Sequence, residues 1–311
     1  MRSSLNQRVR EPVVPERPVA LDANGAVRSE TFPQAGPAAW LDRPDALAAI
    51  DAQLASGTLS PEQARIARDY SRDGVVVLPR FFDPARLAVA WNAYEAALAD
   101  GRITVPAEPI APEDTLPGRA LNPHQQVPEV RALLHDPRLV EVVEFLLGAR
   151  VRPFQTIIGH KGSQQREHSD SIHMTTYPLG YLAGAWIALE DIHPDSGPLT
   201  YYPGSHRLPY IFARDVGITL DDFATTGYQR YHELYEPAVA NAVSAAGLAP
   251  RYFEARAGDV LLWHANIVHA GSARRDPRRS RKALVCHYFA DGCICYHDLA
   301  ARVANFGSPA S

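Results

Sequence analysis

Hydrophobic positions recur at helical spacing through the first half of the chain. Ser60 can cap a helix that begins at Pro61, and Gly74 ends it. The apolar run Val75–Leu78 that follows predicts a short buried strand. Apolar residues spaced three and four apart predict the other helices in this region. The predicted helices cover residues 45–54, 61–73, 83–99 and 137–147.

From Val151 onward the pattern changes to short β-rich runs separated by Gly, Pro, Ser and Asp. Many short strands with such turns predict a sandwich or barrel-like β fold, with the helices on its N-terminal side. A helical insertion over residues 220–246 interrupts the strands, either as a lid over a pocket or as packing against the sheet. The predicted strands are FQTII, HMTTY, YLAGAWIAL, PLTYY, DVLLWH and KALVCHYF.

Composition and length predict one large folded domain. The chain has 311 residues, of which 46% are hydrophobic and 21% charged, and these fractions exclude disorder for most of its length. Residues 1–36 are rich in Pro, Arg and Glu without a sustained period, which predicts a partly flexible leader. Residues 37–311 are then a single domain, with a β core over about 150–292.

Net charge and cysteine usage limit the partners and the cellular compartment that the sequence predicts. The net charge of −4 is too close to balance to predict nucleic acid or an anionic membrane as the main partner. No stretch reaches the roughly 20 apolar residues of a membrane span, and the N-terminus lacks the apolar core of a signal peptide. The three cysteines, all between Cys286 and Cys295, make no disulfide framework. A cytoplasmic protein is predicted, with the oligomeric state left open.

His168-Ser169-Asp170 is the first candidate for a metal-binding motif. In an extended strand, residues two apart point to the same face, so this imidazole and carboxylate can reach one metal ion. The chain has a second such pattern, His193-Pro194-Asp195, but its proline and the following Ser-Gly-Pro predict a surface turn.

Two histidines and one carboxylate form the facial triad of non-haem Fe(II) oxygenases, which leaves three coordination positions open. The third ligand is expected on a distant strand, and the strand 259–264 with its continuation to His269 offers two histidines. His269 is followed by the small residues Ala-Gly-Ser. His264 lies in a more apolar run, which favours a core histidine.

A basic stretch, RRDPRRSRK, follows at residues 274–282, and most of its charges are typical of a solvated loop. Arg281 differs because alternation places it on one strand face with Ala283, Val285 and His287. A buried guanidinium requires a carboxylate partner, and a dicarboxylate cosubstrate can supply it in bidentate fashion. Arg279 and Lys282 are the alternatives if the register of the loop differs.

Other polar and aromatic residues are weaker candidates for a role in the site. Odd spacing places His173 on the face opposite His168, as a pocket, core or surface residue. Tyr177 and Tyr202 are candidates for substrate contact, although tyrosines in a β core usually pack. The run Cys293-x-Cys295-x-His297 lacks a fourth zinc ligand and is interpreted as structural or incidental. The segment 225–237, TTGYQRYHELYEP, is the best candidate for substrate contact from the insertion.

Taken together, these motifs resemble the phytanoyl-CoA dioxygenase family of Fe(II)/2-oxoglutarate oxygenases. The resemblance runs over about residues 155–289, through QTIIGHKGSQQREHSDSIHM, GAWIALEDIHPDSGPLTYYPGSH, GDVLLWHANIVHAGS and SRKALVCHYF. It implies a double-stranded β-helix (jelly-roll) core flanked by N-terminal helices. It also implies that His168, Asp170 and His269 hold the iron, and that Arg281 pairs with the distal carboxylate of 2-oxoglutarate. The further positions implied for the cosubstrate are Trp186, Gln155 and Ser272.

The same resemblance implies an oxidoreductase that uses Fe(II), 2-oxoglutarate and O2, and releases succinate and CO2. Because Asp170 is present, where halogenases of the family have a small residue, a hydroxylase or another oxidative enzyme is expected. The substrate is expected to be a small molecule of secondary-metabolite or saccharide biosynthesis. The alternatives are a cupin-like metalloenzyme that works without 2-oxoglutarate and a non-catalytic small-molecule-binding jelly roll.

Overall fold

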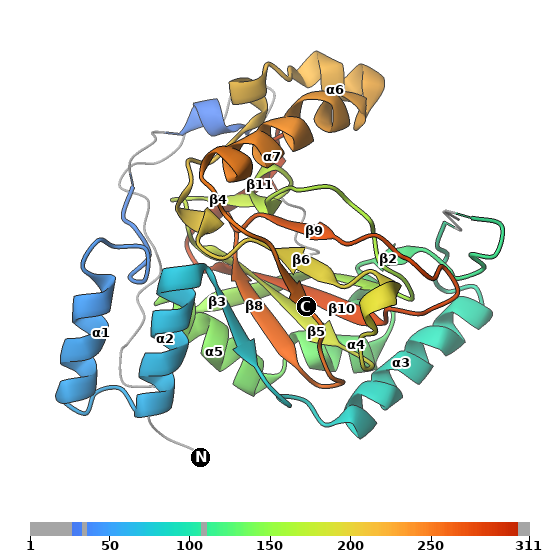
Figure 1. Cartoon of the computed structure of the whole chain (residues 1–311), viewed down its shortest axis with the longest axis horizontal. Coiled ribbons are helices and arrows are strands. Elements are labelled where there is room, and N and C mark those ends of the chain that lie inside the picture. The colour runs from blue at the N-terminus through green and yellow to red at the C-terminus, as the bar shows by residue number, and fades with distance from the viewer. Residues whose placement is uncertain (1–26, 33–35, 107–110, 304–311) are drawn as a thin grey trace.

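The computed structural model of the chain describes residues 27–32, 36–106 and 111–303. Its strands pair in antiparallel fashion in three sheets, and helices pack around them (Figure 1). The largest sheet has the order β1-β8-β5-β10-β3-β2, and the two smaller sheets have the orders β7-β6-β9 and β12-β11-β4. The strands are β1 Val75–Leu78, β2 Arg119–Leu121, β3 Val151–Gly159, β4 Thr175–Tyr177, β5 Leu182–Ala188, β6 Leu199–Tyr201, β7 Arg251–Phe253, β8 Val260–His264, β9 His269–Gly271, β10 Ala283–Ala290, β11 Ile294–His297 and β12 Arg302–Val303.

Two of the predicted helices, 61–73 and 137–147, have the predicted bounds, and those at 46–55 and 84–99 differ from prediction by one residue at one end or both. The short helix Pro128–Leu134 was not predicted. The Ser60 hydroxyl accepts a hydrogen bond from the Gln63 amide at 3.2 Å, and the Gln63 side chain accepts one from the Ser60 amide at 2.7 Å. Gly74 ends that helix with a φ of 72°, which glycine adopts without strain. The helices are α1 Ala46–Ala55, α2 Pro61–Asp73, α3 Pro84–Ala99, α4 Pro128–Leu134, α5 Pro137–Leu147, α6 Leu220–Thr226 and α7 Glu236–Ala245.

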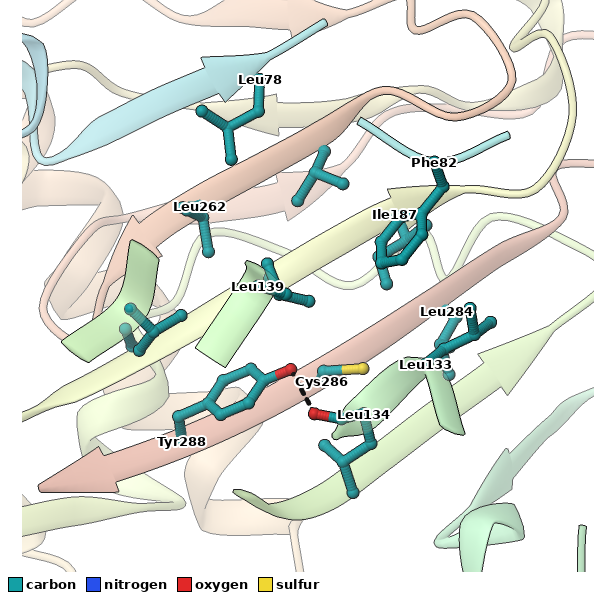
Figure 2. Close-up of a cluster of buried hydrophobic side chains, with 14 of the residues drawn as sticks. Leu78, Phe82, Leu133, Leu134, Leu139, Ile187, Leu262, Leu284, Cys286 and Tyr288 are labelled. Atoms are coloured by element: carbon teal, nitrogen blue, oxygen red, sulfur yellow. Dashed lines mark hydrogen bonds between the residues drawn. The ribbon is translucent and has the colours of Figure 1, made fainter. Parts of the chain in front are cut away.

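One face of the large sheet forms the main hydrophobic core with the helices. Leu262, Leu284 and Tyr288 point from this face toward α4 and α5, and Figure 2 shows them packed against side chains of both helices. The Tyr288 hydroxyl donates a 2.8 Å hydrogen bond to the Leu134 carbonyl, one of the last carbonyls of α4, which have no partner within the helix. The helices thereby brace the sheet from outside.

The opposite face of the large sheet points to the interior of a jelly roll. Period-2 alternation in β8 places Leu261 and Trp263 on this face, whereas Val260 and Leu262 face the helices. The inward residues pack against Leu199 of β6 and other residues of the small sheet β7-β6-β9. The predicted jelly-roll core with N-terminal helices is confirmed.

The insertion between β6 and β7 is helical, as predicted. It contains α6, a π-helical turn at Tyr231–Tyr235 and α7, and Figure 1 shows these helices together at the top of the view. Its buried side chains form a cluster with Ile172, Val268 and Leu299 from the β core. The insertion is therefore packed onto the core through its second part, from Tyr231 to Val243, whereas α6 has no buried residue. Within the described residues, no helix is both long and apolar enough to cross a bilayer.

Several local predictions need correction. Asp170 lies in a 3₁₀ turn, Asp170–Ile172, and not in a strand. The strand that ends at His264 does not continue to His269, because the chain turns there and His269 begins β9 in another sheet. The strand β10 begins at Ala283, although the Arg281 amide still donates to the His160 carbonyl at 2.7 Å and extends the pairing.

The predicted leader falls mostly outside the described residues, which begin at Val27 and omit 33–35. In the described part, Val27, Ser29 and Phe32 are buried. The Ser29 amide donates a 2.8 Å hydrogen bond to the buried Asp298 carboxylate.

We expect Tyr288→Phe to lower the free energy of unfolding by about 1–3 kcal/mol, because the Leu134 carbonyl would be left buried without its donor. Denaturant unfolding measures this difference. The matched control is Tyr252→Phe, since Tyr252 is exposed and its substitution should change stability by less than about 0.5 kcal/mol. Equal stability of the two variants would contradict the assigned role of the hydrogen bond.

Candidate metal centre

An antiparallel backbone bridge brings two distant histidines side by side. The His168 amide donates to the His269 carbonyl at 3.0 Å, and the His269 amide donates to the His168 carbonyl at 2.9 Å. Their rings are consequently 4.3 Å apart between centroids. The 3₁₀ turn that begins at Asp170 directs one carboxylate oxygen, Oδ1, to 3.7 Å from His269 Nε2. Ligand atoms of the three buried side chains lie within 4.8 Å of one another.

Backbone carbonyls determine which ring nitrogen of each histidine can bind a metal. His168 Nδ1 lies 2.7 Å from the Arg166 carbonyl, and His269 Nδ1 lies 3.2 Å from the Ile267 carbonyl. Because a carbonyl can only accept, each Nδ1 must be the protonated donor. Both Nε2 atoms are left as acceptors that can serve as ligands.

The charge states of His168 and Asp170 suit a metal ion. Burial and the neighbouring His269 hold the pKa of His168 well below its usual value, so the ring is neutral near pH 7. Burial by itself would raise the pKa of the Asp170 carboxyl, but the imidazoles of His269, His287 and His168 outweigh it and lower that pKa. A neutral imidazole and an ionised carboxylate are the forms that bind metals.

Arg281 lies on the inner side of the jelly roll beside Trp186, with its guanidinium carbon 5.6 Å from the ring centroid. The side chain is buried, and it donates a single long hydrogen bond, 3.3 Å, to the Gly197 carbonyl. Its Nε has no partner, and no carboxylate of the described residues lies within 4.0 Å of the guanidinium. Burial, followed by the like charges of Arg119 and Arg274, lowers the pKa of Arg281 to about 9.

A second buried arginine comes from the same basic loop, where the sequence predicts mostly solvated charges. That prediction fails for Arg274, which donates to both oxygens of the buried Asp114 carboxylate at 2.6 and 3.1 Å. Lys161 is also buried and shares that carboxylate at 3.3 Å. Arg274 and Lys161 therefore both contact the buried Asp114 carboxylate.

The two other residues expected at the cosubstrate position differ in their surroundings. Gln155 of β3 lies opposite His287 of β10, and its buried Oε1 has no hydrogen-bond partner. The Ser272 hydroxyl is 2.6 Å from the hydroxyl of Thr200, a residue of β6. Both residues are only partly buried.

Aromatic rings from the insertion contact His173, whose ring lies beside that of His168. Because residues 170–172 form a 3₁₀ turn, His173 does not point away from His168 as predicted, and their ring centroids are 6.2 Å apart. The His173 ring is also 4.9 Å from Tyr231 and 5.8 Å from His297. Burial lowers the pKa of His173 to about 3. The Tyr235 hydroxyl, 3.0 Å from the Ser169 hydroxyl, ties the insertion to the ligand segment.

The remaining candidates contact side chains other than those of the three ligand residues. The Tyr177 ring stacks on that of Phe32, with the centroids 4.7 Å apart, in a hydrophobic cluster with Val27 and Tyr296. Tyr202 donates to the Glu167 carboxylate at 3.0 Å. His264 is buried and lies 3.2 Å from the Asp42 carboxylate, on the wall of a separate cavity of about 500 Å³, so its prediction as a core histidine is confirmed.

Two inward residues of the large sheet were missed by sequence reasoning. The Trp263 indole N–H donates to Asp170 Oδ2 at 2.7 Å, and His287 Nε2 lies 3.4 Å from the same oxygen. Alternation already places His287 on the face of Arg281. The sequence does not show, however, that this face meets the turn at Asp170, because that contact joins distant segments.

Comparison with known proteins identifies the family whose sequence pattern this chain matches and a relative of similar sequence. The sequence pattern of the family described as Phytanoyl-CoA dioxygenase (PhyH) matches residues 70–283. An ectoine dioxygenase of Sphingopyxis alaskensis is 30% identical over 233 residues, which cover 70% of this chain and 73% of that protein.

Solved structures share the fold. The non-heme alpha ketoglutarate dependent carbocyclase SnoK from nogalamycin biosynthesis superposes with a TM-score of 0.59 at 21% identity, over 78% of this chain and 88% of that one. EctD from S. alaskensis, solved with 2-oxoglutarate and 5-hydroxyectoine, superposes with a TM-score of 0.55 at 24% identity, over 75% and 76%. At these identities the superpositions support the jelly-roll assignment only.

We expect His168→Ala to weaken Mn(II) binding by more than about 100-fold, since loss of a direct ligand should exceed the 10–100-fold that loss of an outer partner causes. Equilibrium titration followed by electron paramagnetic resonance measures the affinity. The control is His193→Ala, which alters the other His-x-Asp pattern in an exposed turn and should bind Mn(II) as the unaltered protein does. Equal loss in both variants would contradict the assigned site.

Proposed function

The chain belongs to the phytanoyl-CoA dioxygenase family of Fe(II)- and 2-oxoglutarate-dependent oxygenases, and from this premise we propose that His168, Asp170 and His269 hold its iron. The protein is an oxidoreductase that acts on a small molecule, with 2-oxoglutarate and O2 as cosubstrates and succinate and CO2 as products. We propose that the reaction it catalyses on this molecule is hydroxylation or a related oxidation.

The donor set supports the choice of iron. Two imidazole nitrogens and one carboxylate oxygen are the ligands that non-haem Fe(II) prefers, and they leave positions open for exchangeable ligands. The backbone carbonyls that hold Nδ1 of both histidines fix the ring orientation and the tautomer before any metal binds. The site is therefore preorganised for three facial ligands.

The observation that carries the cosubstrate proposal is the buried guanidinium of Arg281. A buried cation without an acid partner is costly, and a carboxylate ligand removes that cost by forming charge-assisted hydrogen bonds. The nearby Arg274 cannot do the same because Asp114 occupies its guanidinium. We assign the distal carboxylate of 2-oxoglutarate to Arg281, with Trp186 beside it and Gln155 and Ser272 as hydrogen-bonding groups.

When bound, iron would supply the means to activate O2 with the oxidation of 2-oxoglutarate, which is the oxidising power needed to remove hydrogen from a substrate carbon. The residues of the chain provide orientation and exclusion of water. The jelly-roll interior buries all three ligand side chains, and the insertion packs its cluster onto Ile172 and Val268, next in sequence to the ligand segments. A dry site of this kind limits side reactions of the oxidant with solvent.

We propose that the insertion, residues 220–246, forms the part of the site that contacts the substrate. Connected ring contacts between 4.9 and 5.8 Å join Tyr228, Tyr231, His173 and His297, and the group reaches His168 through His173. Such rings offer apolar faces with polar edges, which suits a partly polar organic substrate. We propose a small molecule of secondary-metabolite or saccharide biosynthesis. Succinate formation stimulated by candidate substrates is the measurement that ranks these classes.

We also propose that the protein works in the cytoplasm. Its three cysteines are free, and Cys286 and Cys295 are buried. Burial raises the pKa of both thiols, to about 12 for Cys286, which leaves them as unreactive thiols at neutral pH. Free buried thiols are typical of proteins in reducing compartments.

We expect Arg281→Ala to raise the KM for 2-oxoglutarate roughly 10- to 150-fold, the equivalent of a charge-assisted hydrogen bond of about 1.5–3 kcal/mol. Succinate formation as a function of 2-oxoglutarate concentration measures this change.

The matched control is Arg278→Ala, which removes an exposed arginine of the same loop that pairs with Asp276. This variant should retain the original KM. An Arg281→Ala protein with full activity and no dependence on 2-oxoglutarate would instead support a cupin-like enzyme. Binding of Fe(II) without any conversion of 2-oxoglutarate would support a non-catalytic binding protein.

A further inference from the structure

The two oxygens of the Asp170 carboxylate have different surroundings. Oδ1 faces His269, whose Nε2 is 3.7 Å away. Oδ2 faces the large sheet, where the Trp263 indole N–H donates to it at 2.7 Å and His287 Nε2 lies 3.4 Å away. Only the indole bond has the length of a normal hydrogen bond. One oxygen is thus engaged by the protein, and the other is directed to the metal position.

The indole can reach Asp170 because of a glycine on the neighbouring strand. Gly184 of β5 is the register partner of Trp263 on one side and of His287 on the other. A Cβ at Gly184 would lie 2.6 Å from the indole nitrogen, closer than two unbonded atoms can approach. Glycine at this position therefore lets the indole lie across the sheet toward Asp170.

The indole is also fixed on its other sides. Trp263 is buried, and its ring lies 5.1 Å from that of His269 and 6.1 Å from that of His287. The donor thus approaches Asp170 from a rigid strand and not from a mobile loop. A rigid donor on one oxygen restricts rotation of the whole carboxylate, because the two oxygens share one plane.

We propose that Trp263, with the space provided by Gly184, is a positioning residue that presents Asp170 to the metal through Oδ1 alone. This inference rests on the proposed function, since it takes the three-residue site to be the metal site. Holding Oδ2 by a hydrogen bond disfavours bidentate binding by the carboxylate. It thereby preserves an additional coordination position for exchangeable ligands.

The test uses Co(II) as a spectroscopic probe for the metal site of the full chain. We expect Trp263→Phe, which retains an aromatic ring and removes the N–H, to raise the Kd for Co(II) by about 10- to 100-fold. The visible absorption bands of bound Co(II) should also shift, because a freed carboxylate changes the coordination geometry. Gly184→Ala, which leaves the indole chemically intact but displaces it, should change both measurements in the same direction.

The matched control is Trp40→Phe. The Trp40 indole donates a 2.8 Å hydrogen bond to the Phe145 carbonyl, a bond of similar length to an acceptor outside the site. We expect this variant to retain both the Kd and the absorption bands of the unaltered protein. Equal changes in the Trp40 and Trp263 variants would overturn the inference, because a general loosening of the fold would then explain them.

Two further outcomes separate this inference from the proposed function. If the unaltered protein binds Co(II) and Trp263→Phe binds it with the same Kd and the same bands, only the positioning role is overturned. If the unaltered protein binds no Co(II), the metal site itself is overturned, and the positioning role with it.

Discussion

The pairing of His168 with His269 across two backbone hydrogen bonds is the constraint on which the site depends. These residues come from distant parts of the sequence, and only closure of the jelly roll brings them into register. The same bridge sets the direction of both imidazoles, since each Nδ1 is already committed to a backbone carbonyl. Metal-ligand geometry is thus built into strand pairing and does not depend on mobile loops.

The division of the large sheet into two faces explains how such a polar interior is stable. The outward face is an apolar surface covered by helices, and it supplies the hydrophobic burial that stabilises the fold. The inward face can then carry polar groups whose burial is unfavourable by itself. Examples are the Arg281 guanidinium, whose Nε has no hydrogen-bond partner, and the His287 imidazole, in which neither nitrogen has one. Unsatisfied buried groups of this kind are found at functional sites, where a ligand completes them.

Sequence reasoning predicted the features that depend on local rules. The cap at Ser60, the stop at Gly74 and the strand that begins at Ala283, just after Arg281, follow from neighbouring residues alone. It also selected the three residues that the structure brings together. It failed where the chain leaves regular structure: the 3₁₀ turn at Asp170 reverses the direction expected for His173. The pairing of Arg274 with Asp114 and the contact of Trp263 with Asp170 join distant segments, and neither pair carries a local sequence signal.

The central claim is that the interior of the roll combines a metal and 2-oxoglutarate for oxidation by O2. The most direct test is the product balance of the Fe(II)-loaded protein supplied with 2-oxoglutarate, with and without O2. The account predicts succinate and CO2 in equal amounts, formed only when Fe(II) and O2 are both present. A protein that binds Fe(II) tightly but neither binds nor decarboxylates 2-oxoglutarate would contradict it.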